Sequence, residues 1–517
     1  MKQPTWLAPV FLLVLCLLVY GRVLTFGYTN WDDPTYIVNN PVLQQADAAS
    51  LRGVFTPGSI PHEVLYIPVT YLSFWLERAC FDLRPDALHG TNLLLHLANV
   101  LLLWALLRGR FAAGLVAFAG ALLFALHPLQ VETVAWCSGR KDLLATAFAL
   151  LCLHAWQRKQ SQWSLVFAAF AIFAKPTMLI LPALLLIWDP ASWRERRPTL
   201  VATAALSLIA FFLNQSSLPL PADIPPLATR LAHAPWIAGD TLFRFLLIDQ
   251  ALHFYPWPES RVLGSVIGLL IGVAAVFGMI WGWRRQQDWL WMGIAFAVVA
   301  LAPMAKLLMG YREFITADRY TYFPMIGVAI VISGALSHLP AKRLPIAGIA
   351  LGLLSLGLVA LSWPQVGKWR NSVTLWRDYV DTERSAFGHH QLGRAIRADQ
   401  GSAEDALDAL ETAQSLGGDT PGLFYDLGVT YEEFGRSSAA LDAYRDTLTR
   451  NPNFVEAVVN SGNIFLARAE YENAIILYNR ALEFDTPFRE SIIANRKIAE
   501  SAIAAAKPSH ETPPASE

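Results

Sequence analysis

The sequence predicts an all-α protein in which a polytopic bundle of about 11 membrane-spanning helices precedes a soluble α-solenoid of short repeats. Hydrophobic residues make up 54% of the 517 residues and charged residues 16%, whereas soluble domains carry about 25% charge. Apolar runs that approach the ~20 residues needed to cross a bilayer recur up to residue 362. A periodicity of 34 residues appears after residue 385.

The membrane part contains eleven apolar runs that we take as spans. The first lacks a small-residue cleavage site, so we expect it to remain as a helix. One further apolar segment, 236–255, carries Asp240, Arg244 and Asp249, which are costly in lipid, and whether it spans or is re-entrant stays open. The eleven runs are 6–24, 91–107, 111–127, 143–156, 161–174, 177–189, 199–213, 262–282, 289–305, 320–336 and 344–362.

Basic residues predict the orientation of these spans, because cytoplasmic loops are enriched in Lys and Arg. If segment 236–255 does not cross and the N-terminus is cytoplasmic, every inner loop holds at least two basic residues, including the pairs near 284 and 342. If it does cross, both of those pairs lie outside. We therefore expect a multi-pass protein whose long loops and C-terminal repeats lie on the external side, which is the periplasm, the ER lumen or an equivalent compartment. Of these we favour a bacterial inner membrane with the repeats on the periplasmic side.

The C-terminal part resembles tetratricopeptide repeats at small, aromatic and turn positions. One unit places the signature at Phe424, Leu427, Gly428, Tyr431, Ala440, Tyr444 and Pro452. A second copy follows 34 residues later, and a weaker one precedes it with one residue inserted. We expect a membrane domain over 1–363, a linker over 364–386, about three repeats and a capping helix over 387–505, and a disordered tail over 506–517. The repeats suit a peptide or protein partner, or alternatively a spacer or assembly surface.

An acidic pair follows the first span in the stretch FGYTNWDDPTYIVNNP. A carboxylate of Asp32 or Asp33 at the membrane surface could accept the proton of an attacking hydroxyl. The same pair could equally form a turn before Pro34. Asn39 and Asn40, which follow closely, are candidates for contact with a substrate.

Cations at the external ends of other spans are candidate phosphate ligands. Arg140 and Lys141 begin one span, Lys175 lies between two apolar runs, and Arg319 begins another. Positive side chains hold phosphates through charge-assisted hydrogen bonds, although such residues can also serve as anchors. Near these cations lie further substrate-site candidates: His127, Glu132, Asp318, Tyr320 and Tyr322.

Other classes of protein are disfavoured. The formal net charge of -1 gives no reason to expect a nucleic-acid partner. The chain contains no glycine-rich nucleotide loop, nucleophile elbow or HExxH motif. No cofactor is implied with certainty, no metal site is predicted, and a requirement for a divalent metal stays open.

Together these motifs resemble the membrane tetratricopeptide-repeat O-mannosyltransferases of the GT-C superfamily, in a bacterial version. The resemblance lies in WDDPTYIVNNP, YIPVTYLSFWLE, HGTNLLLHLANVLL, LFALHPLQVETVAWCSGRKDLL, FAKPTMLILPALLLIWDP and ADRYTYFP, followed by the repeats. It implies a polyprenyl-phosphate sugar donor, inversion at the anomeric carbon and transfer of a hexose such as mannose to a protein hydroxyl outside the membrane. Asp32 matches the position of the catalytic base, with Asp33 as its neighbour. Arg140, Lys175 and Arg319 match positions that face the donor phosphate.

Two alternatives stay open from the sequence. The first is a GT-C enzyme that modifies a lipid or an envelope glycan, because the motifs do not identify the acceptor. The second is a non-enzymatic membrane anchor that displays a repeat scaffold. The charged residues at the external ends of spans argue against this second alternative, because a passive anchor does not need them.

Overall fold

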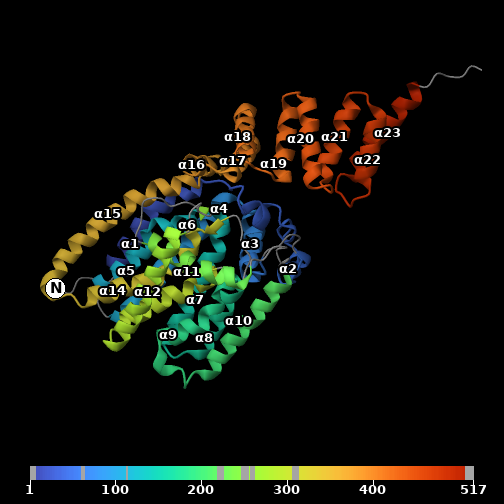
Figure 1. The fold of residues 1–517 in the computed structure, drawn as a ribbon. Coiled ribbons are helices and arrows are strands. Elements are labelled where there is room, and N and C mark those ends of the chain that lie inside the picture. Colours follow the sequence, from blue (N-terminus) through green and yellow to red (C-terminus); the bar gives the residue numbers. More distant parts are fainter. Residues whose placement is uncertain are drawn as a thin grey trace, which may run out of the picture. The chain divides into compact units, whose positions relative to one another are not determined.

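The protein consists of two helical units. The computed structural model describes residues 7–59, 65–111, 114–217, 226–245, 255–256, 262–305 and 314–506, and it divides into Met1–Asn371 and Ser372–Glu517 (Figure 1). The strands found in these ranges, β1 (Tyr255–Pro256) and β2 (Phe314–Thr316), pair in one small antiparallel sheet. The all-α fold class is confirmed.

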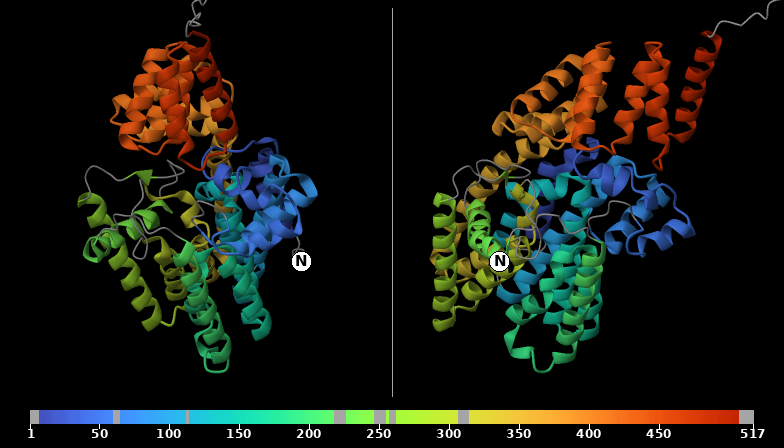
Figure 2. Two further views of the ribbon diagram at one scale, coloured as in Figure 1. Left: turned by 90° about the vertical axis from the view of Figure 1, so that its right-hand side faces the viewer. Right: turned by 45° about the vertical axis from the view of Figure 1, so that its right-hand side comes forward.

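The first unit is a bundle of long apolar helices (Figures 1 and 2). Within it α7 packs against α4 and α8, while α5 packs against α4 and α14. The long helices are α1 (Leu7–Tyr20), α4 (Pro85–Phe111), α5 (Gly114–Leu126), α7 (Arg140–Gln157), α8 (Ser161–Ala174), α9 (Leu181–Trp188), α10 (Arg197–Ser217), α11 (Leu227–Arg244), α12 (Val262–Arg284), α13 (Asp288–Leu301), α14 (Met325–Ser337) and α15 (Leu344–Lys368).

Five helices of this bundle are long and apolar enough to cross a membrane, and a bent pair brings the number to six within the described ranges. The five are Leu7–Thr25, Pro85–Phe111, Arg197–Gln215, Val266–Arg284 and Leu344–Lys368. The other runs taken as spans also contain helices, but these are shorter or more charged, so the count of eleven stays a prediction. Segment 236–255 begins in α11, and its residues 246–254 lie outside the described part.

Helix breaks interrupt the bundle at three places that matter for the site. Gly114–Leu126 and Pro128–Ala135 are bent by 57° at His127, and the second piece contains α6 (Val131–Ala135). Lys175 has an extended backbone between α8 and the 3-10 helix η6 (Pro176–Ile180), as expected for a residue that precedes proline. The 3-10 helix η9 (Asp318–Thr321) lies between β2 and α14.

The long loop after α1 forms a small lobe with a hydrophobic core of its own. It contains α2 (Ala48–Val54), α3 (Pro68–Phe81) and the short helical turns η2 (Pro34–Val38) and η3 (Pro41–Leu43). This packing fixes the segment that carries the acidic pair. The buried core residues are Tyr36, Ile37, Val42, Leu43, Val54, Ile67, Tyr71, Phe74, Leu83, Leu88 and Cys137.

The second unit is a stack of antiparallel helix pairs. The first helices of successive pairs begin at Ala386, Pro421, Val455 and Arg489, so the interval is 35 residues once and 34 residues twice. The expected single insertion accounts for the longer interval. The helices are α16 (Ser372–Thr382), α17 (Ala386–Ala398), α18 (Ala403–Ser415), α19 (Pro421–Glu433), α20 (Ser437–Arg450), α21 (Val455–Ala467), α22 (Tyr471–Leu482) and α23 (Arg489–Ala506).

The segment 364–386, expected to be a linker, contains the end of α15 and all of α16. Helix α16 packs on α17 and buries Trp376 and Tyr379. An atom placed as Cβ on Gly388 would lie 2.7 Å from the Tyr379 ring. From Ser372 onward the segment therefore belongs to the repeat unit, because its aromatic side chains need a surface to cover them.

Close contact between the two helices of a repeat predicts the effect of one glycine substitution. A Cβ on Gly428 would lie 2.4 Å from Tyr444, so Gly428→Ala should force the ring out of place and cost about 1–3 kcal/mol. We expect faster hydrogen exchange in α19 and α20. The matched control is Gly422→Ala, where the nearest atom lies 3.6 Å away and a helical alanine is favoured. Equal exchange in both variants would contradict this packing.

Candidate active site

Asp33 is an anchor between the first-loop lobe and the segment before α7. Its carboxylate is fully buried and accepts four hydrogen bonds. Oδ2 accepts from the backbone N–H and the hydroxyl of Thr29 at 2.9 and 3.1 Å. Oδ1 accepts from the backbone N–H and the hydroxyl of Ser138 at 3.0 and 2.6 Å. These donors occupy both oxygens, so Asp33 holds the lobe in place and has little capacity left for a substrate.

Asp32 is the accessible member of the pair. Its side chain is 32% exposed, and Oδ2 lies 3.4 Å from Nζ of Lys141, whose side chain is 6% exposed. The ammonium of Lys141 also lies 4.1 Å from the ring centroid of Tyr36 and 5.0 Å from that of Trp136. Asp32 therefore combines solvent access with a buried cation beside it.

Two further ion pairs, both buried, involve residues expected at the site. The guanidinium of Arg319 donates to Glu132, whose other oxygen accepts from the Arg319 backbone N–H at 2.7 Å. The ammonium of Lys175 donates to Asp142. The six residues of the three pairs are here called the ionic cluster: Asp32, Glu132, Lys141, Asp142, Lys175 and Arg319.

Aromatic rings link these pairs. Lys141 and Arg319 both lie against Trp136, with Arg319 5.3 Å from its ring centroid. Tyr320 lies 5.1 Å from Arg319 and 5.8 Å from Lys175. The ionic cluster thus gathers charges from the first-loop lobe, from α6 and α7, and from the helix breaks near residues 175 and 319.

A small cleft beside the ionic cluster has two kinds of wall. Asp142, Lys175, Arg319 and Tyr320 supply its polar part. The rest is mainly apolar and comprises Thr177, Met178, Ile180, Ala300, Met304, Phe323 and Pro324. Such a lining matches a ligand with an anionic head and a hydrocarbon tail, because each part meets a surface of its own polarity.

Arg140 lies outside the ionic cluster, in a separate buried network. Its guanidinium donates to both oxygens of Glu77 at 3.1 and 3.2 Å and to the Leu88 carbonyl at 2.9 Å. Its Nε donates to Asn92, and it lies 5.2 Å from the ring of Phe74. The structure therefore ties Arg140 to α3 and α4 and does not place it beside Lys175 and Arg319.

The other expected residues fall into two groups. Asn39 is exposed, whereas Asn40 donates to the Tyr36 carbonyl and accepts from the Val42 N–H, both at 3.1 Å. His127 caps the turn after α5 by accepting from the Leu129 N–H. The second group comprises Asp318 and Tyr322. Asp318 is buried and lines a second small cleft with Glu132. The hydroxyl of Tyr322 contacts His96 and Asn99 at 2.8 and 3.2 Å.

Three important partners were missed as site residues by the sequence reasoning: Glu77, Ser138 and Asp142. Asp142 had a detectable signal, because a lysine within an apolar region requires a counter-ion and an Arg-Lys-Asp run supplies an acid. Glu77 and Ser138 had none, because their partners lie 63 and 105 residues away along the chain. Among the described residues, no group of three His, Cys, Asp or Glu side chains could hold a metal ion.

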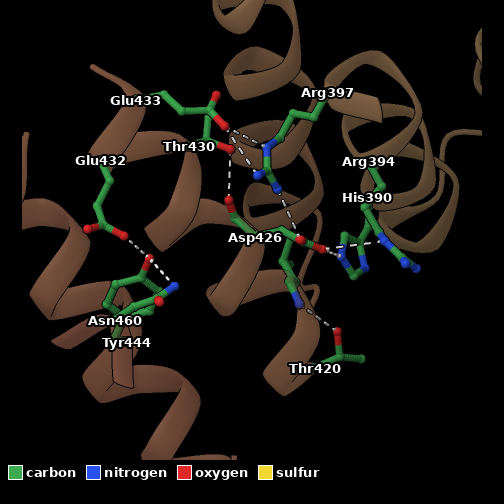
Figure 3. Close-up of polar contacts among 11 residues, drawn as sticks. His390, Arg394, Arg397, Thr420, Asp426, Thr430, Glu432, Glu433, Tyr444 and Asn460 are labelled. Atoms are coloured by element: carbon green, nitrogen blue, oxygen red, sulfur yellow. Dashed lines mark hydrogen bonds and ion pairs between the residues drawn. The ribbon is translucent and has the colours of Figure 1, made fainter. Parts of the chain in front are cut away.

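The repeat unit carries a second polar cluster, formed by α17 and α19 (Figure 3). Asp426 lies 2.8 Å from His390, 3.6 Å from Arg394 and 3.3 Å from Arg397. Arg397 also pairs with Glu433 at 3.2 Å. These contacts balance the cations of one repeat with carboxylates of the next, so they stabilise the stacking of the two repeats.

Comparisons with known proteins agree with the resemblance read from the motifs. No family model matches the chain. It is 23% identical to the protein O-mannosyl-transferase F38B6.6 of Caenorhabditis elegans, over 73% of this chain and 58% of that protein. It is 24% identical to the human protein O-mannosyl-transferase TMTC1, over 77% and 54%, and 20% identical to human TMTC3, over 84% and 55%. The chain thus spans a little over half the length of these curated relatives.

Solved structures offer only weak likenesses. A crystal structure of MamA is 17% identical and covers 26% of this chain and 88% of its own, with a TM-score of 0.22. A crystal structure of the hetero-tetramer Cut9-Hcn1 is 14% identical and covers 85% and 90%, also with a TM-score of 0.22.

The environment of Asp33 predicts a pH-dependent stability. Burial raises the pKa of Asp33 from 3.8 to about 6, against the opposing effect of the hydrogen bonds from Ser138 and Thr29. Because the folded pKa lies above the unfolded one, the stability contributed by the protonated carboxyl is complete below about pH 4 and is lost as the pH rises through about 6. We expect the unfolding midpoint of the wild type in detergent to fall over this range relative to Asp33→Asn, which does not titrate.

The control is Asp82→Asn in the same lobe, whose side chain is 79% exposed. This variant should follow the wild type at each pH. Parallel curves for the wild type and Asp33→Asn would show that Asp33 does not titrate in this range.

Proposed function

We propose that this chain is a membrane glycosyltransferase that transfers a hexose, such as mannose, from a polyprenyl-phosphate donor to a protein hydroxyl on the external side of the membrane. The observation that carries the proposal is the ionic cluster, in which an accessible carboxylate, three cations and a partly apolar cleft adjoin one another. Similarity to protein O-mannosyl-transferases over most of the chain supports the same reaction class.

Asp32 is the general base in this proposal. The acceptor oxygen attacks the anomeric carbon and forms the new glycosidic bond while Asp32 takes the hydroxyl proton. The bond between the anomeric carbon and the phosphate oxygen breaks, and its electron pair stays on the polyprenyl phosphate. One displacement from the opposite face inverts the anomeric configuration.

Lys141, Lys175 and Arg319 bind the donor phosphate. Each is fixed by a carboxylate and an aromatic ring, so the positive charges are held in position before the substrate arrives. Negative charge grows on the phosphate as the sugar departs, and preorganised cations stabilise that charge more in the transition state than in the ground state. The apolar wall of the cleft, formed by residues such as Met178 and Phe323, accommodates the start of the polyprenyl chain.

Arg140 supports this site from outside. The sequence places it among the phosphate ligands, but its donors already serve Glu77, Asn92 and the Leu88 carbonyl. In the proposed mechanism Arg140 therefore braces α3 against α4 and the start of α7, and a donor contact would require these bonds to open.

The repeats bind the polypeptide acceptor or a protein partner in this proposal. Stacked helix pairs expose a continuous surface suited to an extended chain. An enzyme acting on a lipid or glycan would not need such a surface, and a passive scaffold would not need the ionic cluster. Analysis of glycoproteins by mass spectrometry, with and without the gene, tests the acceptor class directly.

The role of Asp32 predicts a large loss of turnover. Asp32→Asn keeps the size of the side chain but cannot accept the proton, so sugar transfer should fall by about 10²–10⁴. The measurement is transfer of radiolabelled mannose from a polyprenyl-phosphate donor by the reconstituted protein. Asp82→Asn removes an exposed carboxylate of the same lobe and should leave turnover unchanged. Near-normal turnover by Asp32→Asn would rule out Asp32 as the base.

The geometry of Arg319 predicts a graded effect on use of the donor. Arg319→Ala should lower kcat/KM for the donor by at least tenfold, because a cation that meets the departing phosphate is lost. Arg319→Lys should recover only part of this loss, since lysine cannot form a two-pronged contact. Unfolding midpoints must accompany the assay, because Glu132 loses its partner in Arg319→Ala. Equal kcat/KM for a folded Arg319→Ala would remove the residue from the donor site.

A further inference from the structure

The cleft beside the ionic cluster contains a carboxylate oxygen that no group among the described residues satisfies. Asp142 lines the cleft and is buried. Its Oδ1 accepts from Lys175, whereas Oδ2 receives no hydrogen bond within the described part of the chain. Leaving a buried acceptor without a donor costs more free energy than an ordinary hydrogen bond contributes. An orphaned oxygen at this place therefore indicates that a ligand supplies the donor.

Three kinds of ligand group can be compared at this oxygen: a phosphate, a metal ion and a hydroxyl. A phosphate diester has no hydrogen to give and would be repelled by the carboxylate, so it belongs beside Lys175 and Arg319 on the same lining. A metal ion fits poorly, because the described residues offer no group of three ligands and two cations already line the cleft. Sugar hydroxyls, by contrast, donate readily to carboxylates.

We infer that Asp142 binds the sugar of the donor: Oδ2 accepts a hydrogen bond from a hydroxyl of the hexose, while Oδ1 keeps Lys175 in place for the phosphate. This inference rests on the proposed function and names a specificity-determining residue within it. One carboxylate thereby sets the distance between the phosphate and the sugar ring. Asp142 takes no part in the transfer of the proton.

The experiment compares one lipid that carries the sugar with one that does not; the sugar-free phosphate monoester also carries up to one more negative charge near neutral pH, so each variant is compared with the wild type on the same lipid. Binding of polyprenyl-phosphate mannose and of sugar-free polyprenyl phosphate is measured for the wild type and for Asp142→Asn in nanodiscs. We expect Asp142→Asn to bind the mannosyl lipid about tenfold to a hundredfold more weakly, as for loss of a hydrogen bond to a charged group. It should bind the sugar-free lipid at least as well as the wild type, because a negative charge beside the phosphate has gone.

Analogues of the donor identify the contact more finely. Among monodeoxy-mannosyl donors, one should bind the wild type clearly more weakly than mannose does, and this difference should shrink in Asp142→Asn. Such coupling between a protein group and a ligand group is the signature of a direct contact. Weaker binding of both lipids to the same extent would assign Asp142 only to the support of Lys175 and overturn the inference.

If Asp142→Asn does not fold, a double substitution that leaves the net charge unchanged provides the test. Asp142→Asn combined with Lys175→Gln removes both charges together, and it is compared with Lys175→Gln alone. The affinity for the mannosyl lipid relative to that for the sugar-free lipid should be higher in the single variant than in the double variant. If the wild type binds neither lipid, the proposed donor is wrong and the inference with it. If the wild type binds both and Asp142→Asn keeps its affinity for the mannosyl lipid, the inference alone is wrong.

Discussion

The pairing of buried charges is the constraint on which the membrane unit depends. Within the described part of this unit, three ion pairs bury both side chains: Arg140 with Glu77, Lys175 with Asp142, and Arg319 with Glu132. Removing a charge from water costs several kcal/mol even after relaxation, and a well-packed apolar side chain in its place is often more stable. Stability alone does not explain such pairs, and the anionic donor of the proposed function supplies a reason for them.

Irregular backbone within the bundle follows from the same constraint. Lys175 and Arg319 lie at breaks between helices, and Glu132 follows the bend at His127. Backbone groups that leave a helix within a membrane must be covered by protein or line a cavity. Breaks and charges therefore occur together, because each break lets a polar side chain reach a shared interior site from a different helix.

The sequence was informative wherever a signal is local. Apolar runs located the helices of the bundle, and positions such as Gly428 and Tyr444 located the repeats, because both signals depend on neighbouring residues. Asp142 was a detectable counter-ion for Lys175, 33 positions away, whereas the pairing of Arg319 with Glu132 was beyond reach, since these residues are 187 positions apart. For the same reason the sequence listed Arg140 with the phosphate ligands, although the fold gives it to Glu77.

The division of labour within the acidic pair also needed the fold. Neighbouring residues point in different directions, so the protein can hydrogen-bond both oxygens of one carboxylate while the other carboxylate stays accessible to a substrate. Asp33 uses both oxygens to hold Thr29 and Ser138, which fixes the turn that presents Asp32. Asp32 keeps a single long contact with Lys141. In the proposed mechanism the donor phosphate competes for that ammonium, so binding of the donor loosens the base from its partner. In that mechanism the rigid carboxylate of Asp33 fixes the turn from which Asp32 reaches the substrate.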